Sequence, residues 1–149
     1  VLTDRGLGPA LEALVARSPI PVDVDVPSER FPPAIEAAAY YVTAEALANV
    51  VKYAGASEAR VRIAEDEESG AMVAEIEDDG VGGADPTLGS GLEGLVDRVE
   101  TLDGALEIVS PPGGGTRIRA TIPLTARDLG GRAGIVTALD PSATAKADR

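Results

Sequence analysis

The segment Asp78–Gly94 reads Asp-Asp-Gly-Val-Gly-Gly-Ala-Asp-Pro-Thr-Leu-Gly-Ser-Gly-Leu-Glu-Gly, and we expect the fold to be organised around it. The mostly apolar segment 71–76 just before it predicts a strand that leads into the acidic pair. Glycine lets a backbone adopt positive φ angles and approach a ligand closely, at a cost in chain entropy that a plain connector would avoid. The loop is dense in this residue, with glycine at Gly80, Gly82, Gly83, Gly89, Gly91 and Gly94.

The pattern after this loop predicts a helix over 92–102. The amides and the positive dipole end at a helix N-terminus favour phosphate. An acidic pair before the loop and a helix start after it therefore indicate a nucleotide bound between them. The spacing matches neither Gly-x-x-x-x-Gly-Lys-Ser/Thr nor a Gly-x-Gly-x-x-Gly turn after a first strand. The alternative at this point is a mobile surface loop without a ligand.

Composition narrows the class of protein. The 149 residues suffice for one domain with a real core, and 44% of them are apolar. The absence of Cys excludes disulfides and thiolate metal sites and fits a reducing, cytoplasmic compartment. No apolar run is long enough to cross a membrane, and no signal peptide is apparent. The net charge of −12 comes without a basic patch, so we expect neither a nucleic-acid partner nor direct membrane contact.

Hydrophobic periodicity predicts an α/β (α+β) chain. Helices can cover only one face of a largely antiparallel sheet, which gives a two-layer α/β sandwich with a mixed, mostly antiparallel sheet. The strand order stays open. We expect one domain over 1–125 and a poorly ordered tail over 126–149. The predicted helices are 7–16, 32–54 and 92–102, and the predicted strands are 21–26, 58–65, 71–77, 105–110 and 116–124.

The long helix carries a polar stripe beside its core stripe. At 100° per residue, Glu45, Asn49 and Lys52 share one narrow face, and Tyr53 lies next to it. A solvated helix face would also hold such residues. The stripe borders the core instead of opposing it, which favours a functional role.

Four blocks, taken in order, resemble the catalytic ATP-binding domain of sensor histidine kinases, in the superfamily shared with DNA gyrase and MutL (the Bergerat fold). Glu45–Ala54 looks like the N box, and Asp78–Gly82 looks like the Asp-x-Gly-x-Gly box. Gly89–Leu95 looks like the Gly-x-Gly box, and 113–116 like the last glycine–threonine turn. The short gap between the two glycine boxes and the run 94–99 are similar to the nitrate-sensor-like subfamily, which usually partners LuxR-type response regulators.

The resemblance implies a role for each residue. Asp78 would accept a hydrogen bond from the adenine amino group; its alternative role is to begin a turn after the strand. Asn49 would bind Mg²⁺, which prefers hard oxygen ligands. Lys52 would direct its charge toward the ATP phosphates. Tyr53 would pack against the purine, although many relatives have His there.

The remaining roles concern the γ-phosphate and the loop. Glu45 lies where related ATP hydrolases activate water and where kinases assist the phosphoacceptor or the metal. The glycines would supply a mobile lid and phosphate-facing backbone, and Thr116 would close the adenine pocket with its hydroxyl, unless it is a plain strand residue. The lid and pocket set is Gly80, Gly82, Gly89, Gly91, Leu92 and Thr116.

The sequence contains no histidine, so it lacks the phosphoacceptor that the resemblance requires. We therefore expect an excised, monomeric catalytic domain whose phosphoacceptor and dimerisation domain lies upstream in a parent kinase. Whether that parent is membrane-anchored stays open. Two alternatives remain open. One is a stand-alone serine kinase of the anti-sigma-factor type, and the other is a nucleotide-sensing module without catalysis.

Overall fold

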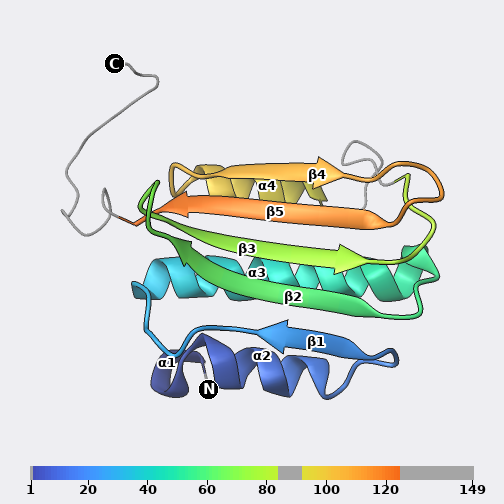
Figure 1. Cartoon of the computed structure of the whole chain (residues 1–149). Coiled ribbons are helices and arrows are strands. Elements are labelled where there is room, and N and C mark those ends of the chain that lie inside the picture. The colour runs from blue at the N-terminus through green and yellow to red at the C-terminus, as the bar shows by residue number, and fades with distance from the viewer. Residues whose placement is uncertain (1, 84–91, 125–149) are drawn as a thin grey trace.

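The chain forms a five-stranded sheet with helices packed on one face (Figure 1). This computed structural model describes residues 2–83 and 92–124, so the predicted tail 126–149 lies outside the described residues. The elements in chain order are α1 (Leu2–Arg5), α2 (Leu7–Val15), β1 (Val22–Asp25), α3 (Pro33–Asn49), the π-helical turn η1 (Val50–Ala54), β2 (Ala59–Asp66), β3 (Ala71–Asp78), α4 (Leu92–Glu100), β4 (Ala105–Val109) and β5 (Thr116–Pro123). The predicted two-layer sandwich is confirmed.

The strand order, which the sequence left open, is β1-β2-β3-β5-β4. β1 runs parallel to β2, and the other neighbouring pairs are antiparallel. A parallel pair needs a long crossover, and α3 lies in the connection between β1 and β2. The sheet is therefore mixed and mostly antiparallel. The strand order places the last residue of β3, Asp78, opposite the first residue of β5, Thr116.

The core lies between α3, α4 and the helix-facing side of the sheet. Strand residues alternate between the two faces, and the buried ones include Ala59, Val61 and Ile63 of β2 and Met72, Ala74 and Ile76 of β3. α3 contributes a small-residue stripe, which lets the helix pack closely on the strands. Among the side chains with almost no exposed surface are Leu11, Ile35, Val42, Val61, Met72, Leu95, Val99 and Ile122.

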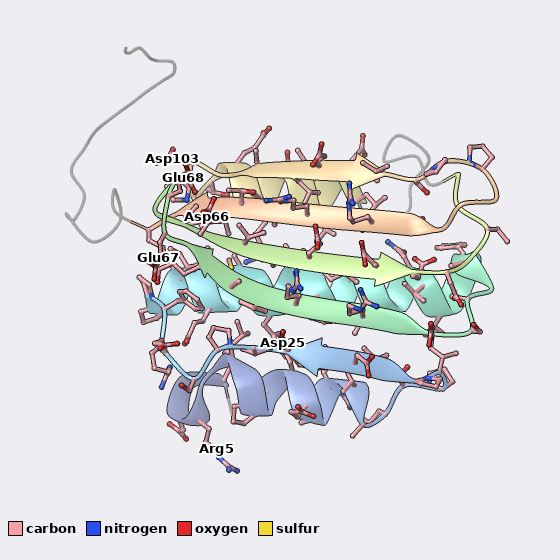
Figure 2. All side chains as sticks on the ribbon, in the orientation of Figure 1. Arg5, Asp25, Asp66, Glu67, Glu68 and Asp103 are labelled. Atoms are coloured by element: carbon pink, nitrogen blue, oxygen red, sulfur yellow. The ribbon has the colours of Figure 1, made fainter. Side chains whose placement is uncertain are left out.

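The opposite face of the sheet carries charges that alternate in sign from strand to strand. Figure 2 views this face, with Asp25 labelled at the end of β1. Cross-strand neighbours of opposite charge stabilise a sheet, whereas like charges destabilise it. The pairing registers define one such row across all five strands: Asp25, Arg62, Glu75, Arg119 and Glu107. A face built in this way stays in water, which explains why the described helices gather on the other side.

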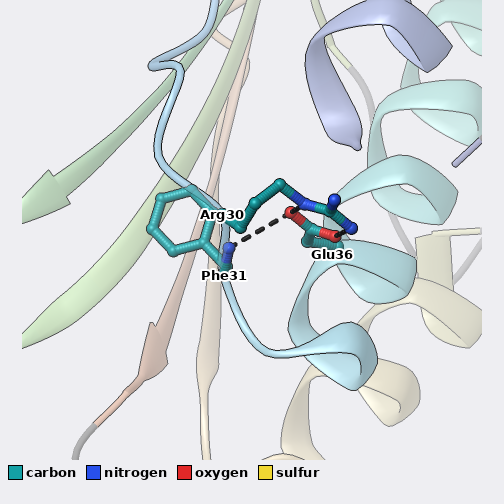
Figure 3. A network of polar contacts seen from close by, with 3 residues as sticks. All are labelled: Arg30, Phe31 and Glu36. Atoms are coloured by element: carbon teal, nitrogen blue, oxygen red, sulfur yellow. Dashed lines mark hydrogen bonds and ion pairs between the residues drawn. The ribbon is translucent and has the colours of Figure 1, made fainter. Parts of the chain in front are cut away.

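A buried carboxylate fixes the start of α3 (Figure 3). Glu36 is only 3% exposed, and its two oxygens accept hydrogen bonds from Nε and Nη2 of Arg30, each at 3.0 Å. The Phe31 amide also donates to Glu36, at 3.1 Å. A buried charge is tolerated when it is paired and hydrogen-bonded in this way. The network holds the segment before α3 against the helix.

Two local predictions were wrong. The sequence pattern predicted one α-helix up to Ala54, but the α-helix ends at Asn49 and continues as a π-helical turn. The short helix α1 was not predicted, since four residues carry too little periodicity. Gly55 ends the helical segment as a C-cap with a left-handed backbone, φ 60° and ψ 30°. In the described part of the chain, no helix combines the length and the hydropathy that a membrane crossing requires.

Candidate functional site

The candidate site lies where the end of the long helix meets the end of β3. The Val81 amide donates a hydrogen bond to the Ala54 carbonyl oxygen at 2.8 Å. At Gly80, a Cβ atom would lie 2.3 Å from that same oxygen, so only glycine fits there. The N-box helix and the first glycine box, which are 24 residues apart between Ala54 and Asp78, are thus in direct backbone contact.

Asp78 is the last residue of β3 and shares with Ile76 the face of the strand that points toward the helices. Its Oδ1 accepts a hydrogen bond from the Gly80 amide at 2.7 Å, so it does begin a turn, the alternative role considered above. Burial raises the pKa of this carboxyl, and the nearby charge of Asp79 raises it further. The amides of Gly80 and Thr116 act in the opposite direction. A half-buried carboxylate that retains acceptor capacity suits recognition of an amino group.

Asp79, which the sequence analysis did not assign to the site, is a structural anchor. Its Oδ1 accepts from the amides of Ser57 at 2.8 Å and Glu58 at 3.1 Å, and its Oδ2 accepts from the Ser57 hydroxyl. The Ser57 hydroxyl and the two amides hold the pKa of Asp79 below its usual value. A sequence signal existed only in the repeated Asp, because Ser57 is 22 residues away.

The N-box residues divide into two groups. Glu45 and Asn49 lie one turn apart on α3 and are both partly buried. Lys52 and Tyr53 lie on η1 and are exposed, Tyr53 by 62%. The wider π turn changes the angular step between residues, so the single polar stripe predicted for a continuous α-helix does not persist beyond Asn49. Single π turns occur often at functional sites.

Asn49 meets a simple test for a metal-binding amide. Its Nδ2 is buried, and no partner for it occurs among residues 2–83 and 92–124. A buried polar group without a partner is rare, and an amide can rotate to present its oxygen instead. The described residues hold no cluster of three or more acidic, His or Cys side chains that could bind a metal by themselves. A hard cation would therefore depend on Asn49 and on oxygens from a ligand and water, which is the usual mode for Mg²⁺.

The glycine loop is braced by the β4–β5 turn. The Gly83 amide donates to the Ser110 carbonyl at 2.8 Å, and the Gly113 amide donates to the Val81 carbonyl at 2.6 Å. Gly82 has φ 68°, and a Cβ atom there would lie 2.0 Å from the Pro111 carbonyl oxygen. The loop therefore leaves β3 along a fixed path at least as far as Gly83.

The remaining predicted site residues lie on both sides of this loop. The Thr116 and Ser110 hydroxyl oxygens are 2.6 Å apart, so Thr116 has a polar neighbour beside Asp78. Leu92 begins α4, and its side chain is part of the core. Gly89 and Gly91 lie outside the described residues.

A shallow hollow near Asp78 is not suited to phosphate. It is lined by one arginine and mostly by acidic side chains: Asp23, Glu58, Ala59, Arg60, Glu77, Asp78 and Asp79. The carboxylates that line this hollow would repel a triphosphate bound in it. Phosphate groups would therefore lie on the helix side, where Asn49 and Lys52 are found.

Comparisons with known proteins agree with this geometry. Residues 34–126, more than half of the chain, match the family described as histidine kinase-, DNA gyrase B-, and HSP90-like ATPase. The chain is 36% identical over 137 residues to the sensor histidine kinase NarS of Mycobacterium tuberculosis, covering 83% of this chain and 31% of that protein. It is 37% identical over 101 residues to the signal transduction histidine-protein kinase/phosphatase DegS of Brevibacillus brevis, covering 67% of this chain and 26% of that protein.

The fold has matching solved structures. A blue-light activated histidine kinase from Erythrobacter litoralis, EL346, aligns with a TM-score of 0.71 at 24% identity, over 83% of this chain and 42% of that one. The curated relatives are much longer, since this chain spans between about a quarter and a third of their length. The chain belongs to the histidine kinase-, DNA gyrase B-, and HSP90-like ATPase family, as an ATP-binding catalytic domain of the kind found in sensor histidine kinases.

Proposed function

We propose that this domain binds Mg-ATP and transfers the γ-phosphoryl group to a histidine on a separate dimerisation domain. The observation that carries the proposal is the half-buried Asp78 carboxylate next to the end of the N-box helix. Asp78 would accept a hydrogen bond from the adenine amino group, beside Thr116. Tyr53 would cover the exposed side of the base.

The phosphate end of the site would be formed by the helix and the glycine loop. Asn49 would present its amide oxygen to Mg²⁺, and Lys52 would face the phosphates. When bound, Mg²⁺ supplies neutralisation of phosphate charge. Glu45, one turn before Asn49, would orient the phosphoacceptor or the metal's water. Backbone at Gly80, Gly82, Gly89, Gly91 and Leu92 would surround the nucleotide, and phosphoryl transfer depends mainly on such positioning.

The partners follow from what this sequence lacks. It has no histidine, so the phosphoacceptor must be on another domain of the parent kinase. That domain would pass the phosphoryl group to a response regulator, which we propose to be of the LuxR type from the pattern at 94–99 and from the similarity to NarS. We place the reaction in the cytoplasm, where ATP and response regulators occur.

An ATP titration by calorimetry tests the first half of the proposal. We expect the wild-type chain to bind ATP with a dissociation constant in the micromolar range or weaker, roughly 6–8 kcal/mol of binding free energy. Affinity should rise with Mg²⁺ and should be lost in Asp78→Ala, whereas GTP should bind poorly to both. A folded wild-type chain that binds no adenine nucleotide would contradict the proposal.

The second half concerns the acceptor. The chain is incubated with radiolabelled ATP and a dimerisation domain that carries the histidine. The phosphoryl group transferred to that domain should be labile to acid and stable to base. Asn49→Ala should remove the transfer. An acid-stable product on a serine-containing protein would instead support the anti-sigma-factor type of kinase.

A further inference from the structure

Asp79 ties together the two segments that carry the nucleotide-site residues. The antiparallel ladder between β2 and β3 ends at the pair Ala59 and Asp78. Asp79 lies one residue beyond this ladder, where backbone pairing has stopped. Its carboxylate continues the link between the two segments by accepting hydrogen bonds from the amides of Ser57 and Glu58 and from the Ser57 hydroxyl.

A second tie lies directly beside the first. The Val81 amide donates to the Ala54 carbonyl, and the absence of a side chain at Gly80 lets the backbones meet. Ala54 is the last residue of η1, and Gly55 then turns the chain with a left-handed backbone. The two ties connect 54–58 to 79–81 and fix the end of η1 relative to the end of β3. We call this pair of ties the clasp.

The clasp sets the position of two proposed nucleotide contacts on η1, Tyr53 at the base and Lys52 at the phosphates, relative to Asp78 at the base. Lys52 and Tyr53 lie on η1, immediately before Ala54, while Asp78 lies immediately before Asp79. The last carbonyl groups of a helix have no partner within it. For Ala54 the partner is the Val81 amide, so the clasp holds the end of η1.

The charge of Asp79 has a cost at this position. It lies next to the half-buried Asp78 and helps to raise the pKa of that carboxyl. A neutral or distant residue would avoid this repulsion. In this structure the carboxylate lies beside Asp78 and accepts from three donors of one short segment, which indicates a positioning role.

We infer that Asp79 is a positioning residue for ATP: through Ser57 and Glu58 it holds Lys52 and Tyr53 of η1 at a fixed separation from Asp78. The inference rests on the proposed function. Asp79 itself does not contact the nucleotide, and its effect passes through the clasp.

The test compares ATP affinity in three variants, measured by calorimetry well below the melting temperature. Asp79→Ala removes all acceptors, and the loosened site should weaken ATP binding about tenfold. Asp79→Asn keeps an oxygen for the two amides and an NH₂ group for the Ser57 oxygen, so binding should stay within about twofold of wild type.

Asp66→Ala is the matched control. Asp66 caps the β2–β3 turn at the opposite end of the same strands (Figure 2), accepting from the Glu68 amide at 3.2 Å and the Ser69 hydroxyl at 2.9 Å. Asp66→Ala loses the same kinds of hydrogen bond as Asp79→Ala, but at the end of the strands away from the site. Its ATP affinity should equal that of wild type even where its stability falls.

A second readout does not depend on ATP. In Asp79→Ala, hydrogen exchange at the amides of Ser57, Glu58 and Val81 should accelerate, and in Asp66→Ala it should not. Unchanged ATP affinity in Asp79→Ala, or an equal loss in Asp66→Ala, would overturn the inference while the proposed function stands. Failure of the wild-type chain to bind ATP would overturn both.

Discussion

Asp78 and Asp79 are neighbours in the chain, but the fold holds their carboxyl groups in opposite ways. Asp78, the last residue of β3, lies on the strand face that points toward the helices, whereas Asp79, just beyond the strand, is exposed to solvent. Burial raises the pKa of the first, and hydrogen bonds from Ser57 and Glu58 lower the pKa of the second. Adjacent, identical side chains thus lie in different environments: Asp78 is half-buried, as its proposed contact with adenine requires, and Asp79 anchors Ser57 and Glu58.

This difference predicts opposite stability changes on replacement by asparagine. A raised pKa means that the contribution of Asp78 to stability is present below the unfolded-state pKa, about 4, and is lost as pH rises through the folded-state pKa. Asp78→Asn avoids this loss, so at pH 7 we expect its melting temperature to increase, on the order of 2 °C after allowance for solvent exposure.

For Asp79 the sign reverses. A lowered pKa gives stability that is present above about pH 4 and is lost as pH falls through the folded-state pKa, so Asp79→Asn should melt below wild type at pH 7. Thermal unfolding followed by circular dichroism from pH 7 downward checks both variants. The melting-temperature differences between each variant and wild type should shrink in acid. Melting-temperature shifts of the same sign in both variants at pH 7 would contradict the opposite pKa directions of Asp78 and Asp79.

At the scale of elements, the site depends on close approach between loops and helix ends. The glycine loop contacts the end of η1 on one side and the β4–β5 turn on the other. Glycine is required at these contacts for two separable reasons, a positive φ angle and the absence of space for a side chain. Gly82 meets both conditions, whereas Gly113 has φ 77° but open space around its missing Cβ.

A pair of alanine substitutions separates the two reasons. Gly113→Ala should lower the free energy of unfolding by about 1–2 kcal/mol, the cost of a left-handed backbone for alanine. Gly82→Ala should lower the free energy of unfolding by at least about 3 kcal/mol, because the clash with the Pro111 carbonyl adds to the cost of the left-handed backbone. Urea denaturation of both variants measures the difference, and equal losses would show that the loop yields at Gly82.

At the scale of the whole molecule, the sheet separates a dry face from a charged one. The charged face keeps opposite signs in register across the strands, so the arginines of β2 and β5 lie opposite acidic residues of β3 in a chain of net charge −12. Arg117 on β5 illustrates this arrangement, since Nε lies 4.0 Å from Glu75 and Nη1 lies 4.0 Å from Glu77. The arrangement disfavours partners that need an apolar or uniformly charged surface.

Reversing that charge should destabilise the domain through repulsion. Arg117→Glu should lower the free energy of unfolding by about 1–2 kcal/mol at low salt, because three carboxylates would then meet on neighbouring strands. Arg117→Gln removes the attraction to Glu75 and Glu77 without adding repulsion, so its free energy of unfolding should fall by less. Urea denaturation at low and high NaCl checks this, since salt should reduce the loss in Arg117→Glu. A loss that is independent of salt would point to packing instead.

Local sequence patterns were enough to predict the layers, most element boundaries and the identity of the boxes. Those features depend on local periodicity and on residues close in sequence, such as Asn49 and Lys52 or the glycines after Asp78. The strand order, the charge rows and the clasp required the tertiary structure. Each depends on pairing between segments far apart in the chain, as between Asp79 and Ser57, and periodicity carries no information about which segments pair. The π turn at Val50–Ala54 belongs with them, because the carbonyl oxygen of its last residue accepts a hydrogen bond from the Val81 amide, which lies 27 residues further along the chain.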